Sequence, residues 1–411
     1  MKQKELILHI GIGKAGSSSI QKFCDANRSY LTDLGFLYPY DLVRDGLGGD
    51  NNKALALSFS ANNNIFANLP KNMVGNFKNI DEWRKQLLQT YSYQFKHTDL
   101  KILLSAEQFW SEMTSDHKLR EFKSYLEGQD IFVSRIIVYF RNQVAWVESY
   151  MAQKCRELKY SSDLYDINFV KRRLDYQKTC ELWSATFPNA MLVVRPFDKS
   201  KWTANDLISD FFDNGLSIRS SAIASLKDVS KTANTTNVDA LCMYLTMELI
   251  KIVYTYNQQQ SVGILRDRFE NIFAELVKSS AGEVPSFSFL SITEYEQIAS
   301  AVTLSNRALF EPIDDSGLFS SLTSGLLKQN VLNNPLTLDA LKLSICKLRL
   351  LTHERFDELC ELFSGTDRKM FLLIYHFLDV LCCDGRMRIS LRIDDFDFFK
   401  EYLDSFDFTN V

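Results

Sequence analysis

The sequence contains no C-x-x-C pair, and none of its 5 histidines stands at metal-ligand spacing from any of its 8 cysteines. Structural metal sites usually show such spacings. We therefore expect no metal site. The thiols are expected to be reduced and mostly buried, as in a cytosolic protein.

Long apolar runs are also missing, since no segment approaches the ~18 uncharged apolar residues of a membrane span. Residues 1–5 lead directly into a predicted strand without the pattern of a signal peptide. These absences predict a cytoplasmic protein with no membrane span. The net charge of −4 and a pI near 5.9 argue against bulk nucleic-acid binding.

What the chain does have is a glycine loop near its N-terminus. Leu6–Ile10 predicts a buried strand, three glycines follow within residues 11–16, and Ser17–Ser19 opens a helix. Glycines allow several backbone N–H groups to point at one anion, and the helix N-terminus adds partial positive charge. The pattern predicts a phosphate-binding loop. A tight turn at Lys14 and a helix N-cap at the serines are the alternatives.

The loop departs from that of nucleoside-triphosphate enzymes. Their G-x-x-x-x-G-K-[ST] pattern has a lysine directly after the second glycine, and this lysine reaches the β- and γ-phosphates. Here Gly11 and Gly16 have the right separation, but Ser17 takes that lysine's position and Lys14 lies inside the loop. This favours a nucleotide with a single 5′-phosphate next to a different leaving group.

Predicted strands and helices alternate along the first half of the chain. Further strands are expected at 36–38, 101–105, 135–141 and 190–197, and an irregular excursion at 41–80. Helices are expected at 81–97, 115–127, 169–187 and 207–212, and Gly215 is expected to stop the last of them. The alternation predicts an α/β protein with a P-loop-like three-layer fold, in which helices flank a central parallel sheet.

The second half reads as helical. Amphipathic helices are expected at 238–278 and 292–310, a linker at 329–335 and more helices at 337–381. The expected organisation is one domain over 1–328, with a core at 1–215 and a helical part at 216–328, followed by a helical C-terminal appendage at 336–411.

The run His9-Ile-Gly-x-x-Lys-x-Gly-Ser-Ser-Ser-Ile-Gln21, with Gly35-Phe-Leu-Tyr-Pro39 after it, is similar to bacterial sulfotransferase-like proteins. It resembles the 5′-phosphosulfate loop of enzymes that use 3′-phosphoadenosine 5′-phosphosulfate (PAPS). Gly13 departs from the family pattern, because many relatives have a bulkier polar residue there. The resemblance implies that the loop holds the 5′ side of PAPS through Gly11, Gly13, Lys14, Ala15, Gly16, Ser17, Ser18 and Ser19.

A second signature lies further along. Arg141 ends a β-branched run, and Ser149 follows eight residues later on the next predicted helix. Family members use this spacing to clamp the 3′-phosphate. An arginine at the carboxyl end of a strand points into the ligand crevice of an open α/β sheet, and its planar fork suits phosphate oxygens. The alternative is an ordinary surface arginine and a packed serine.

The chemistry implied is in-line sulfuryl transfer, which depends on positioning and charge neutralisation and requires no metal. Lys14 is expected to neutralise charge on the bridging oxygen as the nucleotide phosphate leaves. Glu107, at the end of the strand 101–105, is the candidate general base, and a helix cap is its alternative role. His9 is a second candidate base, although a core histidine is the simpler interpretation. Lys171–Arg173 could grip an anionic glycan or form a solvated helix face.

The resemblance thus implies sulfuryl transfer to a hydroxyl or amine, with a bacterial surface carbohydrate as the leading acceptor and PAP as the product. One rival is a small-molecule P-loop kinase, which needs a lysine for the β- and γ-phosphates and a magnesium carboxylate. The other is a non-catalytic PAP-binding protein. The sequence does not indicate the acceptor, the oligomeric state or the role of residues 336–411.

Overall fold

The structure is a computed structural model of the 411-residue chain. It describes residues 3–40, 51–60, 66, 77–156, 170, 172–223, 226, 292–310, 353, 354 and 357. The chain divides into two compact units: the first comprises Met1–Trp146, Lys171–Thr235 and Ala301–Ser320, and the second Val147–Val170, Thr236–Ser300 and Ser321–Val411. The helix expected at 238–278 and the linker lie outside the described residues, and so does nearly all of the C-terminal appendage, including most of the helices expected at 337–381.

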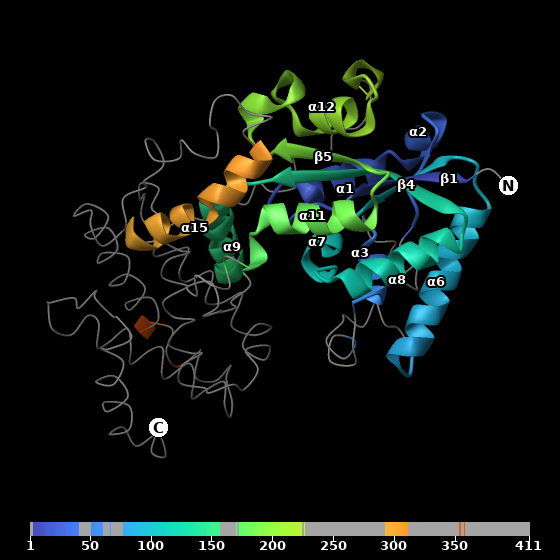
Figure 1. Cartoon of the computed structure of the whole chain (residues 1–411), viewed down its shortest axis with the longest axis horizontal. Helices are drawn as coiled ribbons and strands as arrows, with labels where there is room; N and C mark the ends of the chain where they lie inside the picture. Colours follow the sequence, from blue (N-terminus) through green and yellow to red (C-terminus); the bar gives the residue numbers. More distant parts are fainter. Residues whose placement is uncertain are drawn as a thin grey trace, which may run out of the picture. The chain divides into compact units, whose positions relative to one another are not determined.

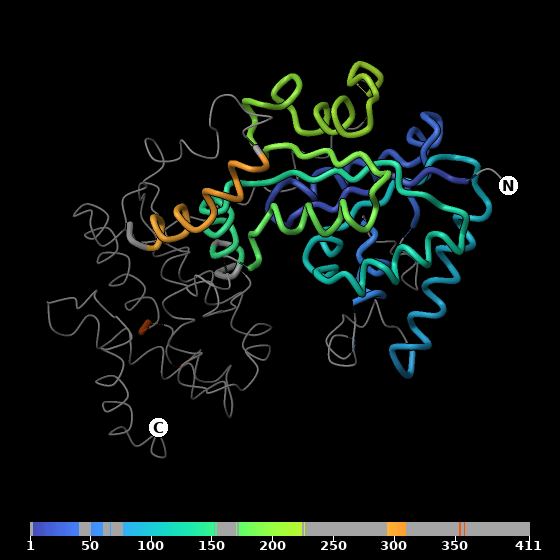
Figure 2. Tube along the Cα trace, in the orientation of Figure 1, coloured from blue at the N-terminus to red at the C-terminus, as the bar shows by residue number. Residues whose placement is uncertain are grey.

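In the described part of the chain, a sheet of five parallel strands forms the centre of the first unit (Figure 1). The strands, in the spatial order β2-β3-β1-β4-β5, are β1 (Lys4–His9), β2 (Phe36–Leu37), β3 (Lys101–Ser105), β4 (Ile131–Phe140) and β5 (Met191–Pro196). β1 is therefore the central strand. The trace in Figure 2 shows β4 between β1 and β5. The apolar run of β1 is buried because helices cover both faces of the sheet.

Among the helices of the described residues, several from the first unit cover the two faces of this sheet. The described helices are α1 (Ser17–Ala26), α2 (Arg28–Asp33), α3 (Lys53–Ser58), α6 (Ile80–Lys96), α7 (Gln108–Glu112), α8 (Asp116–Glu127), α9 (Gln143–Arg156), α11 (Tyr176–Thr186), α12 (Leu207–Asp210) and α15 (Ile292–Phe310). On one face, Phe23 of α1 packs edge-on against Phe212, just after α12, at 5.6 Å between ring centroids. On the other face, Phe109 of α7 packs against Phe122 of α8 at 5.5 Å. Figure 1 shows α12 on one side of the strands and α8 and α11 on the other.

Most expected elements are confirmed. The α/β class and the parallel sheet are as predicted, and the strand at 101–105 and the helices at 81–97, 115–127 and 292–310 match to within one residue. Polar N-caps explain the sharp helix starts: Asn79 and Ser115 each accept a hydrogen bond from the backbone N–H three residues later.

Three expectations were wrong in detail. The helix predicted over 169–187 is broken, and α11 starts only at Tyr176, because the Asp175 side chain accepts from the Lys178 N–H and caps a new helix. The excursion at 41–80 is not irregular throughout: α3 is a buried helix. The strand before Arg141 begins at Ile131, four residues earlier than expected.

Gly215 does not stop the helix at 207–212 as its position suggested. A π-helical turn, Phe211–Leu216, continues through it and ends at Ser217. A Cβ at Gly215 would lie 3.2 Å from Ile137 Cδ1. The turn therefore packs closely on β4 at this glycine, and the helix does not end there.

Candidate functional site

The glycine loop and Arg141 lie at the same edge of the sheet. The loop follows β1 and Arg141 follows β4, and these two strands are neighbours that run parallel. From β1 the chain continues to β2, at one end of the strand order, and from β4 it continues to β5, at the opposite end. Ligands of open α/β sheets bind at such a switch point, outside the carboxyl ends of the strands.

The loop turns sharply into α1. Lys14 and Gly16 both have left-handed backbone conformations, with φ of 68° and 78°. Gly16 is the N-cap of α1 and makes no side-chain cap, so Ser17–Ser19 form the first turn and do not cap the helix. The Ser19 N–H donates to the Gly16 carbonyl at 3.0 Å, whereas the N–H groups of Ser17 and Ser18 precede this first donor and have no acceptor within the helix. The loop therefore ends in the positive end of a helix dipole, which suits an anion.

Gly16 has no space for a side chain. A Cβ there would lie 2.4 Å from Leu207 Cδ2 and 2.7 Å from Phe197 Cε2. The β5–α12 segment thus packs directly against the loop and supports its shape.

Gly16→Ala is expected to destabilise the fold clearly more than Gly35→Ala. Both glycines have positive φ, so each alanine suffers backbone strain of about 1 kcal/mol. Only Gly16→Ala also forces Leu207 aside, for about 1–3 kcal/mol more, since nothing lies within 4 Å of a Cβ at Gly35. Urea unfolding of both variants measures the difference. Equal losses would show that the loop tolerates a side chain at this point.

His9 lies beneath the loop. Its Nδ1 is 2.7 Å from Ser105 Oγ, and its Nε2 has no hydrogen-bond partner among the described residues. A Cβ at Gly11 would lie 2.9 Å from this ring, which explains the glycine. Burial lowers the pKa of His9 to about 3, so the ring is neutral near pH 7 and is a weak base. These features agree with the core-histidine interpretation.

Glu107 reaches the loop from the end of β3. Its Oε2 accepts a long hydrogen bond, 3.4 Å, from the Ser17 hydroxyl, and a Cβ at Gly13 would lie 3.0 Å from the same oxygen. Glu107 occupies the N-cap position of α7, but its side chain makes no capping hydrogen bond. The glycine at 13 leaves room for this carboxylate.

Arg141 contacts the loop directly. Its Nη1 donates to the Lys14 carbonyl at 3.1 Å, and its Cζ lies 5.9 Å from the centre of the Phe197 ring. The side chain is partly buried, and burial lowers the pKa of its guanidinium, which remains charged at neutral pH. Ser149 lies on α9 in the stretch assigned to the second unit, and its proposed phosphate contact stays a prediction.

Sequence reasoning missed Trp146. Its indole N–H donates to the Gly13 carbonyl at 2.7 Å, from the first turns of α9. Arg173, one of the residues in the basic run, lies with its Cζ 5.9 Å from the Trp146 ring centre, whereas Lys171 is outside the described residues. A single sequence carries no signal for such a contact, since it joins residues 133 positions apart.

A buried amide pair anchors the start of α9. Gln143 Nε2 donates to Asn306 Oδ1 at 2.6 Å, and Asn306 Nδ2 donates back to Gln143 Oε1 at 3.0 Å. Both side chains are buried, so each satisfies the other. The end of α15 thereby fixes the helix that carries Trp146.

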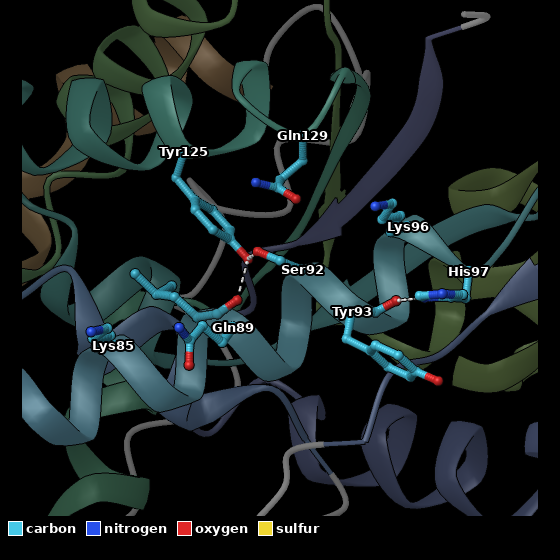
Figure 3. A pocket seen from close by; sticks show the side chains of 9 residues that line it. Lys85, Gln89, Ser92, Tyr93, Lys96, His97, Tyr125 and Gln129 are labelled. Atoms are coloured by element: carbon cyan, nitrogen blue, oxygen red, sulfur yellow. Dashed lines mark hydrogen bonds between the residues drawn. The ribbon is translucent and has the colours of Figure 1, made fainter.

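A hollow of 510 Å³ lies between one face of α6 and the end of α8, and Figure 3 shows the side chains that line it. Both helices end where a strand begins, so it lies at the edge of the sheet opposite the loop. It is lined by exposed side chains of α6, such as Lys85, Tyr93 and Lys96. Tyr125 donates to the Leu88 carbonyl at 3.2 Å across it. These features are those of a solvated helix face.

The remaining expectations concern the cysteines, metal sites and membrane-spanning helices. Cys24 and Cys180 are buried free thiols, and burial raises the pKa of each to about 12, as expected for unreactive core cysteines. Within the described ranges, no group of three or more His, Cys, Asp or Glu side chains could hold a metal ion. No helix in the same ranges is long and apolar enough to span a membrane.

Comparison with known proteins gives little further. No family model matches the chain, and no solved structure matches it. An archaeal protein from Archaeoglobus fulgidus, described as an uncharacterized protein, is 27% identical over 111 residues, which is 27% of this chain and 28% of the archaeal protein. The match therefore spans little more than a quarter of that relative and assigns no activity.

Proposed function

We propose that the protein is a PAPS-dependent sulfotransferase that acts on a hydroxyl or amine group, with a bacterial surface carbohydrate as the leading acceptor. The observation that carries the proposal is the meeting of three separate segments at one sheet edge. Arg141 donates to the loop at Lys14, and Glu107 accepts from the loop at Ser17. The motifs that resemble the family are therefore in contact with each other.

The donor set fits PAPS. The loop presents the N-terminus of α1 for a 5′-phosphate, and Lys14 and Arg141 supply two cations. Arg141 uses one N–H on the Lys14 carbonyl and has four more for a phosphate. A P-loop kinase needs a lysine directly after the second glycine to reach the β- and γ-phosphates, and Ser17 stands at that position. This argues against the P-loop kinase.

In the proposed mechanism, bound PAPS supplies the sulfuryl group. Lys14 neutralises charge that develops on the leaving phosphate, and Arg141 holds the 3′-phosphate together with Ser149. Glu107 Oε2, half-buried and next to Gly13, takes the proton from the acceptor hydroxyl. Phe197 and Leu207 keep the loop in shape behind Gly16. Reduced, buried thiols accord with a cytoplasmic location, which is part of the same proposal.

PAP should raise the melting temperature of the protein, whereas ATP with magnesium should not. A ligand at 100 times its Kd stabilises by about 2.7 kcal/mol, which is several degrees for a domain of this kind. Thermal unfolding with each nucleotide provides the first measurement, and PAPS turnover with hydroxylated acceptors the second. Protection by ATP and magnesium alone would favour the kinase. PAP binding without any turnover would favour a non-catalytic PAP-binding protein.

A further inference from the structure

Two consecutive carbonyl groups of the loop are held by side chains of the β4–α9 segment. Trp146 Nε1 donates to the Gly13 carbonyl at 2.7 Å, and Arg141 Nη1 donates to the Lys14 carbonyl at 3.1 Å. These carbonyls belong to the two peptide planes on either side of the Lys14 Cα. Because each peptide is planar, holding both planes fixes φ and ψ of Lys14, and with them the direction in which its side chain leaves the backbone.

Lys14 needs this support. Its φ of 68° is uncommon for a residue with a side chain, and such conformations persist where the surroundings hold them. The C=O and N–H of a trans peptide also point in opposite directions. The bond from Trp146 to the Gly13 carbonyl therefore turns the Lys14 N–H away from α9.

Trp146 is itself well fixed. Its side chain is only 3% exposed, and its backbone N–H bonds to the Asn142 carbonyl at 2.7 Å in the first turn of α9. Arg173 lies against its ring, and the buried Gln143–Asn306 pair anchors the same turn. A rigid indole can hold a loop in one conformation, which a mobile side chain cannot.

We propose that Trp146 is a positioning residue for the anion-binding loop: its indole N–H sets the conformation at Lys14 that sulfuryl transfer uses. The expected effect on sulfuryl transfer rests on the proposed function, but the effect of Trp146 on the loop conformation can be tested without any nucleotide. The alternative is that Trp146 contributes only to the packing of the core. A phenylalanine would then serve as well.

The chain offers a matched control. Trp183 of α11 is fully buried, and its indole N–H has no hydrogen-bond partner in the described part of the chain. Trp146→Phe and Trp183→Phe both shrink a buried ring, but only Trp146→Phe removes a hydrogen bond to the loop. Trp146→Phe is expected to lower the melting temperature more than Trp183→Phe, because it also loses this hydrogen bond.

Amide hydrogen exchange of the ligand-free protein tests the loop itself. Exchange in a peptide covering residues 10–19 should be several-fold faster in Trp146→Phe than in wild type, and unchanged in Trp183→Phe. PAP affinity should fall about three- to tenfold in Trp146→Phe only, the range expected for one lost hydrogen bond. Turnover of PAPS should show a lower kcat, because Lys14 acts as the sulfuryl group leaves.

The outcomes separate the two proposals. Unchanged exchange at residues 10–19 in Trp146→Phe would overturn the positioning role, whatever PAP does. Faster exchange in that variant, together with no PAP binding by the wild type, would support the positioning of the loop and overturn the sulfotransferase. Equally faster exchange at residues 10–19 in both tryptophan variants would show a general loosening of the core and would also overturn the positioning role.

Discussion

Glu107→Gln is expected to lower PAPS turnover by about 10²–10⁴-fold while PAP affinity stays near wild type. A positioned general base contributes a factor of this size, and glutamine cannot take the acceptor's proton at neutral pH. Glutamine has nearly the same shape and can still accept from the Ser17 hydroxyl, so the loop contact survives. Single-turnover kinetics and PAP titration on the same preparation give both quantities.

Glu112→Gln is the matched control, since Glu112 lies at the other end of α7 and accepts from the Ser111 hydroxyl at 3.4 Å. Its turnover should equal that of wild type. A fully active Glu107→Gln would remove Glu107 as the base and leave His9, despite its low pKa of about 3. His9→Asn should then abolish turnover without unfolding the protein.

The second large effect is expected from Arg141→Ala, which should weaken PAP binding by about 2–4 kcal/mol, the scale of losing a charge-assisted bidentate contact. Arg141 also donates to the Lys14 carbonyl, so part of the loss in binding free energy will come from the lost support of the loop. Adenosine 5′-phosphosulfate, which lacks the 3′-phosphate, isolates that part, and its affinity should fall by only about 0.5–1.5 kcal/mol.

Arg141→Lys is a useful companion, because it keeps the charge and removes the planar fork. It should bind PAP with an affinity between those of wild type and Arg141→Ala. Calorimetric titration of both nucleotides into each variant gives the comparison. Equal losses for PAP and adenosine 5′-phosphosulfate in Arg141→Ala would mean that Arg141 supports the loop and does not contact a 3′-phosphate.

Local patterns predicted the sheet and much of the site. A buried parallel strand is a short apolar run and an amphipathic helix has a 3.6-residue period, so β3, α6 and α8 could be located closely. The glycine loop followed from the same kind of pattern, whereas the family resemblance pointed to Glu107 and Arg141 as candidate site residues. Parallel strands bring their carboxyl ends to one edge, so the loop and these two strand-end residues were expected to lie together.

What could not be predicted depends on partners far away in the sequence. Gly215 looked like a helix stop, but its role is set by Ile137 on a neighbouring strand. The start of α11 depends on the Asp175 cap, which competes with a helical pattern that continues through it. The bond from Trp146 to the loop is purely tertiary. Each is a case in which the three-dimensional neighbour overrides the local preference.

The central position of β1 has a consequence for how the chain folds. β1 leaves the ribosome before the two strands with which it pairs, β3 and β4, and His9 contacts Ser105 from 96 positions away in the sequence. Contacts between such distant segments form slowly, because a long loop must close before they form. Leu6 and Leu8 are fully buried in the folded sheet, but they have no strand to pair with until β3 and β4 have been synthesised. During that interval the nascent chain exposes an apolar, unpaired strand, the kind of segment that chaperones protect from aggregation.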